Sequence, residues 1–296
     1  MPKHLKTHAA LLLANLIYGL NYLVAKDVMP DYVQPFGFIF LRVVGASVIF
    51  WLIGSFFISE KVEKKDFFRL ALCGLFGVAT NQLLFFKGLN ITTEINASII
   101  MTTNPILVLI AASFLLKEKI TGNKIAGILI GLIGAVTLLT VKDDFQFGSD
   151  TVWGDFLVLL NATSYGIYLV IAKPLVNKYH PLTVVKWVYA FGLVFVLPVG
   201  FGEASQINWE SFTPIIWVDV LYVVIFTTII AYFLNIFALK KLSPSVVSTY
   251  LYLQPVFAAS LAVSFGRDEL TWIKIISAIL ICLGVFLVSR PLKKSI

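Results

Sequence analysis

The chain has 296 residues, of which 59% are hydrophobic and 13% are charged. This composition, with a mean hydropathy of +0.91, excludes an ordinary soluble domain. The net charge of +7 could suggest nucleic-acid binding, but the distribution of the basic residues favours a membrane protein.

Apolar runs of about 18 to 25 residues follow one another along the sequence, and each is long enough to cross a bilayer as a helix. The predicted spans are residues 9–26, 34–58, 68–89, 95–116, 122–141, 153–173, 182–201, 215–239, 245–265 and 271–290. The connectors are too short to hold a folded soluble domain. We therefore expect an all-α membrane protein with ten transmembrane helices.

The basic residues are divided unequally between the two sides of the predicted membrane. If the amino terminus is cytoplasmic, 17 of the 23 Lys and Arg residues fall on that side, five on the other side, and Arg42 within a helix. Cytoplasmic loops of membrane proteins retain Lys and Arg. The sequence therefore predicts that both termini are cytoplasmic, which requires an even number of spans.

The second half of the sequence repeats the first. Residues 98–139 align without a gap with residues 248–289, at an offset of 150. Nearer the start of each half, "NLIYGLNYLVAK" (15–26) is similar to "NATSYGIYLVIAK" (161–173), at an offset of roughly 147. These matches predict two copies of one five-helix unit.

An odd number of spans in each copy has a consequence for topology. Two five-helix copies joined in one chain enter the membrane from opposite sides. We expect a first repeat over residues 1–146 and a second, inverted repeat over residues 147–296. Inverted repeats with a site near the bilayer midplane are typical of secondary transporters that work by alternating access.

An amide-Pro pair in each copy is followed about thirteen residues later by an acidic residue, a Thr and a helix that is Gly-rich in the first copy. The second copy departs from this pattern, because Ser277 and Ile281 replace Gly127 and Gly131. With ten helices and a duplicated five-helix unit, this pattern resembles the drug/metabolite transporter superfamily, specifically its EamA-type members. Residues 104–139 match the repeat pattern of that family, and "FLRVVGA" (40–46) resembles its Arg-containing second helix. The resemblance implies a bacterial inner-membrane carrier, often an exporter of amino acids or other small metabolites, with a central cavity between the repeats.

Polar residues interrupt the apolar spans in stripes. Because polar side chains are costly in lipid, such stripes should face the bundle interior or water. At 100° per residue, Asn15, Tyr18 and Tyr22 share one face of the first helix. The alternative is that such groups only join helices to one another. We predict a cavity that binds the solute through Asn15, Tyr18, Tyr22, Arg42, Asn81, Gln82, Asn104, Asn161, Tyr165, Tyr168, Lys186, Tyr232, Asn235, Tyr252 and Gln254.

Two prolines follow polar residues within predicted spans. Pro105 comes after Asn104, and Pro255 comes after Gln254. A proline inside a helix removes a backbone donor and bends the helix. We expect each proline to form a mid-helix kink, which either serves as a gating hinge or is static.

The two basic residues inside or near the spans have alternative interpretations. Arg42 and Lys186 either extend to the nearer interface or attract an anionic group such as a carboxylate. A sugar-nucleotide or phosphate-ester exchanger would need several cavity-facing basic residues, and these two are the candidates.

The sequence offers no constellation for catalysis or metal binding. His4, His8 and His180 lie near the amino terminus or in a loop without metal-ligand spacing, and Cys73 and Cys282 lie within spans. We expect no metal site, no cofactor and no enzyme activity, so a membrane-embedded enzyme or a sensor is disfavoured. No Asp or Glu falls near a predicted midplane, which argues against ion coupling through a carboxylate.

These features together predict a permease or exporter that moves small metabolites such as amino acids by alternating access through an Asn/Tyr-lined cavity. The expected partners are a small-molecule solute and the lipid bilayer, without nucleic acid. The fifth and tenth helices contain few polar groups and could mediate a homodimer. The expected location is the bacterial cytoplasmic (inner) membrane.

Overall fold

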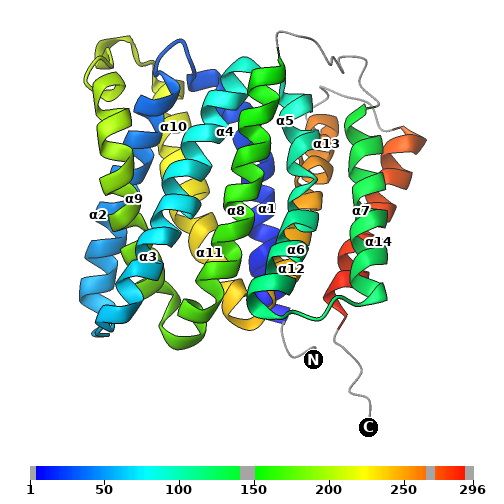
Figure 1. Cartoon of the computed structure of the whole chain (residues 1–296). Coiled ribbons are helices and arrows are strands. Elements are labelled where there is room, and N and C mark those ends of the chain that lie inside the picture. Colours follow the sequence, from blue (N-terminus) through cyan, green and yellow to red (C-terminus); the bar gives the residue numbers. More distant parts are fainter. Residues whose placement is uncertain (1–4, 141–150, 265–270, 291–296) are drawn as a thin grey trace.

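A computed structural model describes residues 5–140, 151–264 and 271–290, and all regular structure in these ranges is helical (Figure 1). The first half contains α1 (Leu5–Val28), α2 (Pro35–Phe57), α3 (Phe67–Gly74), α4 (Thr80–Ile91), α5 (Glu94–Met101), α6 (Asn104–Leu116) and α7 (Gly122–Thr140). The second half contains α8 (Val152–Lys178), α9 (Pro181–Ala204), α10 (Pro214–Tyr222), α11 (Ala231–Lys241), α12 (Pro244–Thr249), α13 (Leu253–Ser264) and α14 (Trp272–Ser289).

Five short segments complete or interrupt these helices. Three are 3₁₀ turns: η1 (Lys64–Asp66), η3 (Trp209–Ser211) and η5 (Tyr250–Tyr252). The other two, η2 (Leu75–Ala79) and η4 (Val223–Ile230), are π-helical. η2 continues α3 into α4, and η4 continues α10 into α11, so each of these runs forms one long, locally widened helix.

Eight helical runs of the described chain are long and apolar enough to cross a membrane. They are residues 35–57, 64–91, 96–116, 122–140, 152–178, 181–204, 214–241 and 272–289. The prediction of a multi-pass helical membrane protein is therefore confirmed. The predicted spans 9–26 and 245–265 fall on α1 and on the run from α12 to α13, which are helical but not among the eight, so ten crossings remain a prediction.

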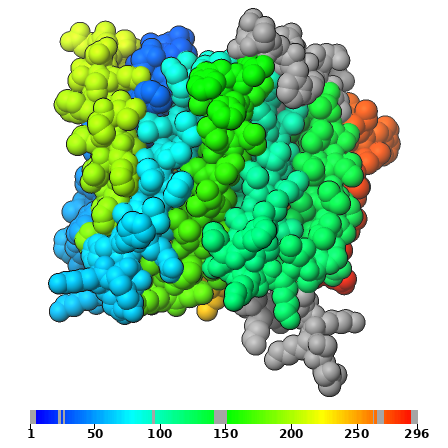
Figure 2. All heavy atoms as spheres, viewed as in Figure 1, coloured from blue at the N-terminus to red at the C-terminus, as the bar shows by residue number. Residues whose placement is uncertain are grey.

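The outer surface of the bundle is apolar, as lipid contact requires. Phe56, Phe114 and Trp272 are each about 80% exposed. On the face shown in Figure 2, side chains fill the spaces between neighbouring helices. The start of α1 and the end of α14 lie at the same end of the bundle, which we call the terminal end; the other is the distal end (Figure 1).

Helices α7 and α14 pack antiparallel through small residues. A Cβ atom added to Gly127 would lie 2.7 Å from the carbonyl oxygen of Gly284, and one added to Gly134 would lie 2.9 Å from that of Ser277. At the offset of 150, Gly134 corresponds to Gly284 and Gly127 to Ser277. The Gly127–Gly284 contact in one direction is therefore equivalent to the Ser277–Gly134 contact in the other, as expected when two copies are related by a two-fold axis.

Helices α2 and α9 also pack antiparallel and show the same exchange. Gly54 lies against the side chain of Lys186, and Gly200 lies against Phe40. At an offset of 146, which aligns Pro35 with Pro181, Gly54 corresponds to Gly200 and Phe40 to Lys186. The boundary predicted between residues 146 and 147 lies outside the described residues.

The two prolines lie at helix starts, so the predicted mid-helix position is wrong. Thr102 and Thr103 separate α5 from α6, and Pro105 is in the first turn of α6. Pro255 is in the first turn of α13, directly after the 3₁₀ turn η5. The first turn of a helix has no internal partner for its N–H groups, so a proline loses no hydrogen bond there. In both runs, a short segment that is not α-helical precedes the helix that contains the proline.

Candidate solute-binding cavity

A cavity of about 90 Å³ lies inside the bundle, where helices of both halves meet. Its lining residues are Tyr18, Asn21, Arg42, Asn81, Gln82, Phe85, Phe86, Met101, Asn161, Tyr165, Thr227, Tyr232, Leu251 and Gln254. Eight of the predicted binding residues are among them: Tyr18, Arg42, Asn81, Gln82, Asn161, Tyr165, Tyr232 and Gln254.

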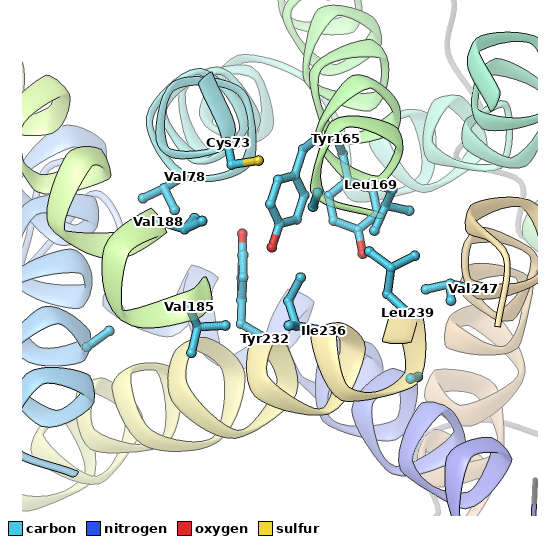
Figure 3. Packing of buried hydrophobic residues seen from close by; sticks show 14 of the residues in the cluster. Cys73, Val78, Tyr165, Leu169, Val185, Val188, Tyr232, Ile236, Leu239 and Val247 are labelled. Carbon is cyan, nitrogen blue, oxygen red and sulfur yellow. The ribbon is translucent and has the colours of Figure 1, made fainter. Parts of the chain in front are cut away.

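A hydrogen bond between the halves of the chain forms part of the cavity wall. Nε2 of Gln82 donates to the hydroxyl of Tyr232 at 3.2 Å. That hydroxyl also lies 3.2 Å from the carbonyl oxygen of Gly77 and 3.2 Å from Oδ1 of Asn81, either of which accepts its single proton. Figure 3 shows Tyr232 on α11 and Tyr165 on α8 extending into the same space.

Three amide groups that line the cavity have a carbonyl oxygen without a hydrogen-bond partner among the described residues. Nδ2 of Asn161 donates to the backbone oxygen of Asn81 at 2.6 Å, which fixes the amide orientation. Oδ1 of Asn161, Oε1 of Gln82 and Oδ1 of Asn21 are buried without a hydrogen-bond partner among the described residues. Buried polar atoms are normally satisfied, so these three acceptors are available to a ligand or to water in the cavity.

Arg42 supplies the charge of the cavity. It is 2% exposed, and its Nε donates to Oγ1 of Thr228 at 2.9 Å. The guanidinium carbon lies 4.7 Å from the ring centre of Phe86, a cation–π contact. Its Nη1 has no hydrogen-bond partner among the described residues. Of the described residues that line the cavity, Arg42 alone is charged.

Lys186 does not line this cavity. Its Nζ lies 4.8 Å from the ring centre of Trp51, and its side chain packs on Gly54 near the terminal end of α2. Arg42, by contrast, lies seven residues from the distal start of α2. The two basic residues are therefore near opposite ends of the α2–α9 pair.

Most of the other predicted binding residues are buried behind the cavity. Asn15 accepts a hydrogen bond from Gln254 at 3.1 Å and so supports a lining residue. Asn104 and Asn235 donate to backbone oxygens of Ala162 and Ala231 at 2.7 and 2.8 Å. Such bonds fit the alternative role of joining or stabilising helices.

Three further predicted residues are aromatic. Tyr168 and Tyr252 are fully buried, and their hydroxyls have no hydrogen-bond partner among the described residues. Neither tyrosine is part of the cavity wall. The side chain of Tyr22 lies outside the described part of the chain.

Six lining residues were not predicted: Asn21, Phe85, Phe86, Met101, Thr227 and Leu251. Asn21 is three residues after Tyr18, so helical spacing could have identified it. Apolar residues in an apolar span carry no such signal. Their presence makes much of the cavity wall apolar, which is common in small-molecule sites.

The terminal end of the bundle is closed below the cavity. The ring of Tyr168 packs directly on Gly77, where a Cβ atom would clash with it. Val78, Val188 and Ile236 lie close by in the apolar core (Figure 3). Asn21 and Arg42 lie nearer the distal ends of α1 and α2, so the cavity is displaced towards the distal end.

Comparison with known proteins agrees with this architecture. An uncharacterized transporter of Archaeoglobus fulgidus is 27% identical over 95% of this chain and 96% of its own length. The uncharacterized transporter YetK of Bacillus subtilis is 27% identical over 97% of this chain and 87% of its own length. A solved structure, titled only as the crystal structure of a protein, has a TM-score of 0.78 at 21% identity and 96% coverage of both chains, which shows a shared fold.

The sequence also matches a family of transporters twice, once in each half. The matched ranges are residues 5–140 and 152–290, which together cover nearly the whole chain. Transport, and not catalysis, is what the family and the names of the relatives indicate. The chain therefore belongs to the EamA-like transporter family.

Proposed function

We propose that this protein is a secondary transporter that carries a small metabolite through the central cavity by alternating access. The observation that supports this most directly is the difference between the two ends of the bundle. A polar cavity lies towards the distal end, whereas the corresponding contacts at the terminal end are packed shut.

The proposed topology is ten crossings in two inverted five-helix repeats, over residues 1–146 and 147–296. Its support is the exchange of equivalent positions in the antiparallel pairs α7–α14 and α2–α9. Two copies related by a two-fold axis make such reciprocal contacts. In this topology both termini are cytoplasmic, in the inner membrane of a bacterium, and the terminal end is the cytoplasmic one.

The repeats suggest how the cavity changes sides. At an offset of 147, Tyr168 corresponds to Asn21, and at 150, Gly77 corresponds to Thr227. Tyr168 packs on Gly77 at the closed end, while Asn21 and Thr227 both line the cavity. If the two halves exchange conformations, Asn21 closes on Thr227 and Tyr168 leaves Gly77, which opens the cytoplasmic end.

The helix breaks near the prolines are suitable hinges for this movement. Thr102 and Thr103 interrupt one run directly before α6, which begins at Asn104, and η5 interrupts the corresponding run directly before Leu253. A turn that is not part of an α-helix can change its backbone angles without breaking a continuous α-helix. We place the gating movement at these turns, with Pro105 and Pro255 stabilising the helices that follow.

The solute is a small metabolite, and amino acids are the leading class. Of the two candidate cations, only Arg42 lines the cavity. A sugar nucleotide or phosphate ester would need more positive charge to bind its phosphates. The phosphate-ester alternative therefore has less support.

A homodimer through α7 and α14 remains part of the proposal in a modified form. Their glycine-rich faces pack on each other within the chain. A dimer would have to use the outer faces, where Leu129, Ile133 and Ile276 are exposed.

The function is tested with purified protein in liposomes. A panel of radiolabelled amino acids, organic acids, nucleosides and sugars is offered, each with and without a pH gradient. Uptake of at least one solute above that of protein-free liposomes, saturable with concentration, is the expected result. If no solute in the panel enters faster than it does without protein, the proposed function is rejected.

A further inference from the structure

We propose that Arg42 binds the carboxylate of a monoanionic or zwitterionic solute, and that the carrier changes conformation readily only while this group is bound. The inference rests on the proposed transport function. The inference adds two points to that function. The cavity recognises a group with one negative charge, and the carrier exchanges one solute molecule for another.

The position of Arg42 leaves part of its guanidinium for a ligand. Nε is engaged by Oγ1 of Thr228, which itself donates to the backbone oxygen of Val223 at 2.8 Å. Phe86 covers one face of the guanidinium. These contacts hold the side chain in place, while Nη1 is left without a partner among the described residues. A pre-positioned, planar donor of this kind matches the geometry of a carboxylate.

None of the described residues supplies a counter-charge for this cation. Among the residues that the structure describes, no carboxylate is paired with Arg42, and the cavity lining contains no Asp or Glu. A single charge within a membrane bundle is costly, and a buried charge without a partner is more so. A ligand with one negative charge at this point removes that cost. A phosphate dianion would leave a surplus negative charge instead.

The equivalent place in the other half is apolar. At an offset of 146, Arg42 corresponds to Val188, and at 150, Thr228 corresponds to Val78. Val78 and Val188 are both fully buried in the core at the closed end (Figure 3). Within the described part of the chain, this position therefore carries a cationic group in one half and an apolar residue in the other, so Arg42 serves both conformations.

This asymmetry links conformational change to the anion. When the distal end closes, Arg42 and Thr228 take the place that Val188 and Val78 occupy at the terminal end. Without a bound solute, this closure would bury an unpaired guanidinium in an apolar contact. With a bound anionic group, it would bury an ion pair that is neutral overall. The loaded carrier thus has the lower barrier, so exchange of solute runs faster than net movement.

The first experiment measures binding without needing the natural solute. The full-length protein in detergent is heated with 4-methylpentanoate, 4-methylpentanamide, L-leucine or L-leucinamide at equal concentration. 4-Methylpentanoate and L-leucine carry a carboxylate, and the other two compounds are their amides. At least one of these two acids is expected to raise the midpoint temperature of unfolding, and the corresponding amide is expected to leave it unchanged. An amide that stabilises as well as its acid, or no stabilisation by either acid, would overturn the assignment.

Variants assign the effect to Arg42. Arg42→Gln should abolish the shift, Arg42→Lys should keep a reduced shift because the charge remains, and Lys186→Gln should keep the full shift. If Arg42→Gln does not yield a monodisperse protein, the size of the shift in Arg42→Lys decides whether Arg42 binds the carboxylate. A shift that is undiminished in Arg42→Lys and equal for acid and amide contradicts a carboxylate site.

The second experiment measures exchange. Proteoliposomes are loaded with the stabilising acid in labelled form and diluted into buffer with or without the same unlabelled acid. Efflux should be about tenfold faster with acid outside, as expected for a barrier lowered by roughly 1.4 kcal/mol. Equal rates would overturn loaded-only movement. Saturable transport of amides or sugars with equal net and exchange rates would refute this inference and leave the transport function intact.

Discussion

Gln82 donates a hydrogen bond to the hydroxyl of Tyr232 at 3.2 Å, and these two residues occupy the same position in the two halves of the chain, 150 residues apart. A contact between equivalent positions maps onto itself when the halves exchange conformations. We therefore expect this bond to persist through the transport cycle, near the axis about which the two repeats move.

Removing the Tyr232 hydroxyl tests this role. Tyr232→Phe loses the bond from Gln82 and the bond to Gly77 or Asn81. We expect a several-fold lower transport rate and a stability loss of about 1 kcal/mol. Initial uptake rates and unfolding midpoints measure the two effects.

A matched tyrosine provides the control for that variant. The hydroxyl of Tyr222 donates to the backbone oxygen of Ile17 at 2.9 Å, and neither of these two residues lines the cavity. Tyr222→Phe should lose a similar amount of stability and keep its transport rate. Equal loss of transport in both variants would show that the Gln82–Tyr232 bond has no special role.

We expect that adding one methyl group at Gly77 opens the closed terminal end. Because the ring of Tyr168 packs on Gly77, Gly77→Ala should disfavour the closed arrangement of this end. Cys73 is fully buried there and reports on the change (Figure 3). In a Cys282→Ser background, a water-soluble maleimide should label Cys73 slowly in the parent and faster in Gly77→Ala.

A second crowded glycine, near the distal end of the same helical run, serves as the control. A Cβ atom on Gly88 would lie 2.8 Å from Cγ2 of Val158, near the distal end. Gly88→Ala should therefore leave Cys73 protected. If both variants expose Cys73 to the same degree, general loosening explains the labelling and the proposed gate is refuted.

The packing of α7 on α14 predicts a large effect on stability. A Cβ atom on Gly284 would lie 2.6 Å from the backbone oxygen of Gly127, which cannot move away easily. We expect Gly284→Val to cost about 1 to 3 kcal/mol of stability. Reversible unfolding in mixed detergent gives the free energy. Gly122→Ala, at a site with no heavy atom within 4 Å, should be close to neutral.

Hydropathy and sequence repetition were sufficient to predict the helical membrane architecture. A bilayer requires each crossing to satisfy its own backbone, so an apolar run of sufficient length allows little but a helix. Local irregularities were not predictable in the same way. Pro105 gives the same sequence signal in a kinked helix and at the start of a new one, and the structure has the second arrangement.

The cavity was predicted in part, for a related reason. Polar residues such as Gln82 and Tyr232 are conspicuous in an apolar span, and both line the cavity. Depth in the membrane does not specify which way a side chain faces, so Lys186 was predicted to bind the solute in the cavity but lies against Trp51 instead. Phe86 could not be distinguished from any other phenylalanine until the helices were placed.

The most direct test of the account is the orientation of equivalent positions in the two repeats. Lys119 and Glu269 correspond at the offset of 150. Each is replaced singly by Cys in a Cys73→Ser, Cys282→Ser background, and intact cells are treated with an impermeant thiol reagent. The account predicts that Glu269→Cys is labelled from outside and that Lys119→Cys is labelled only after the membrane is opened. Labelling of both positions from the same side would contradict the inverted repeat and the transport mechanism that rests on it.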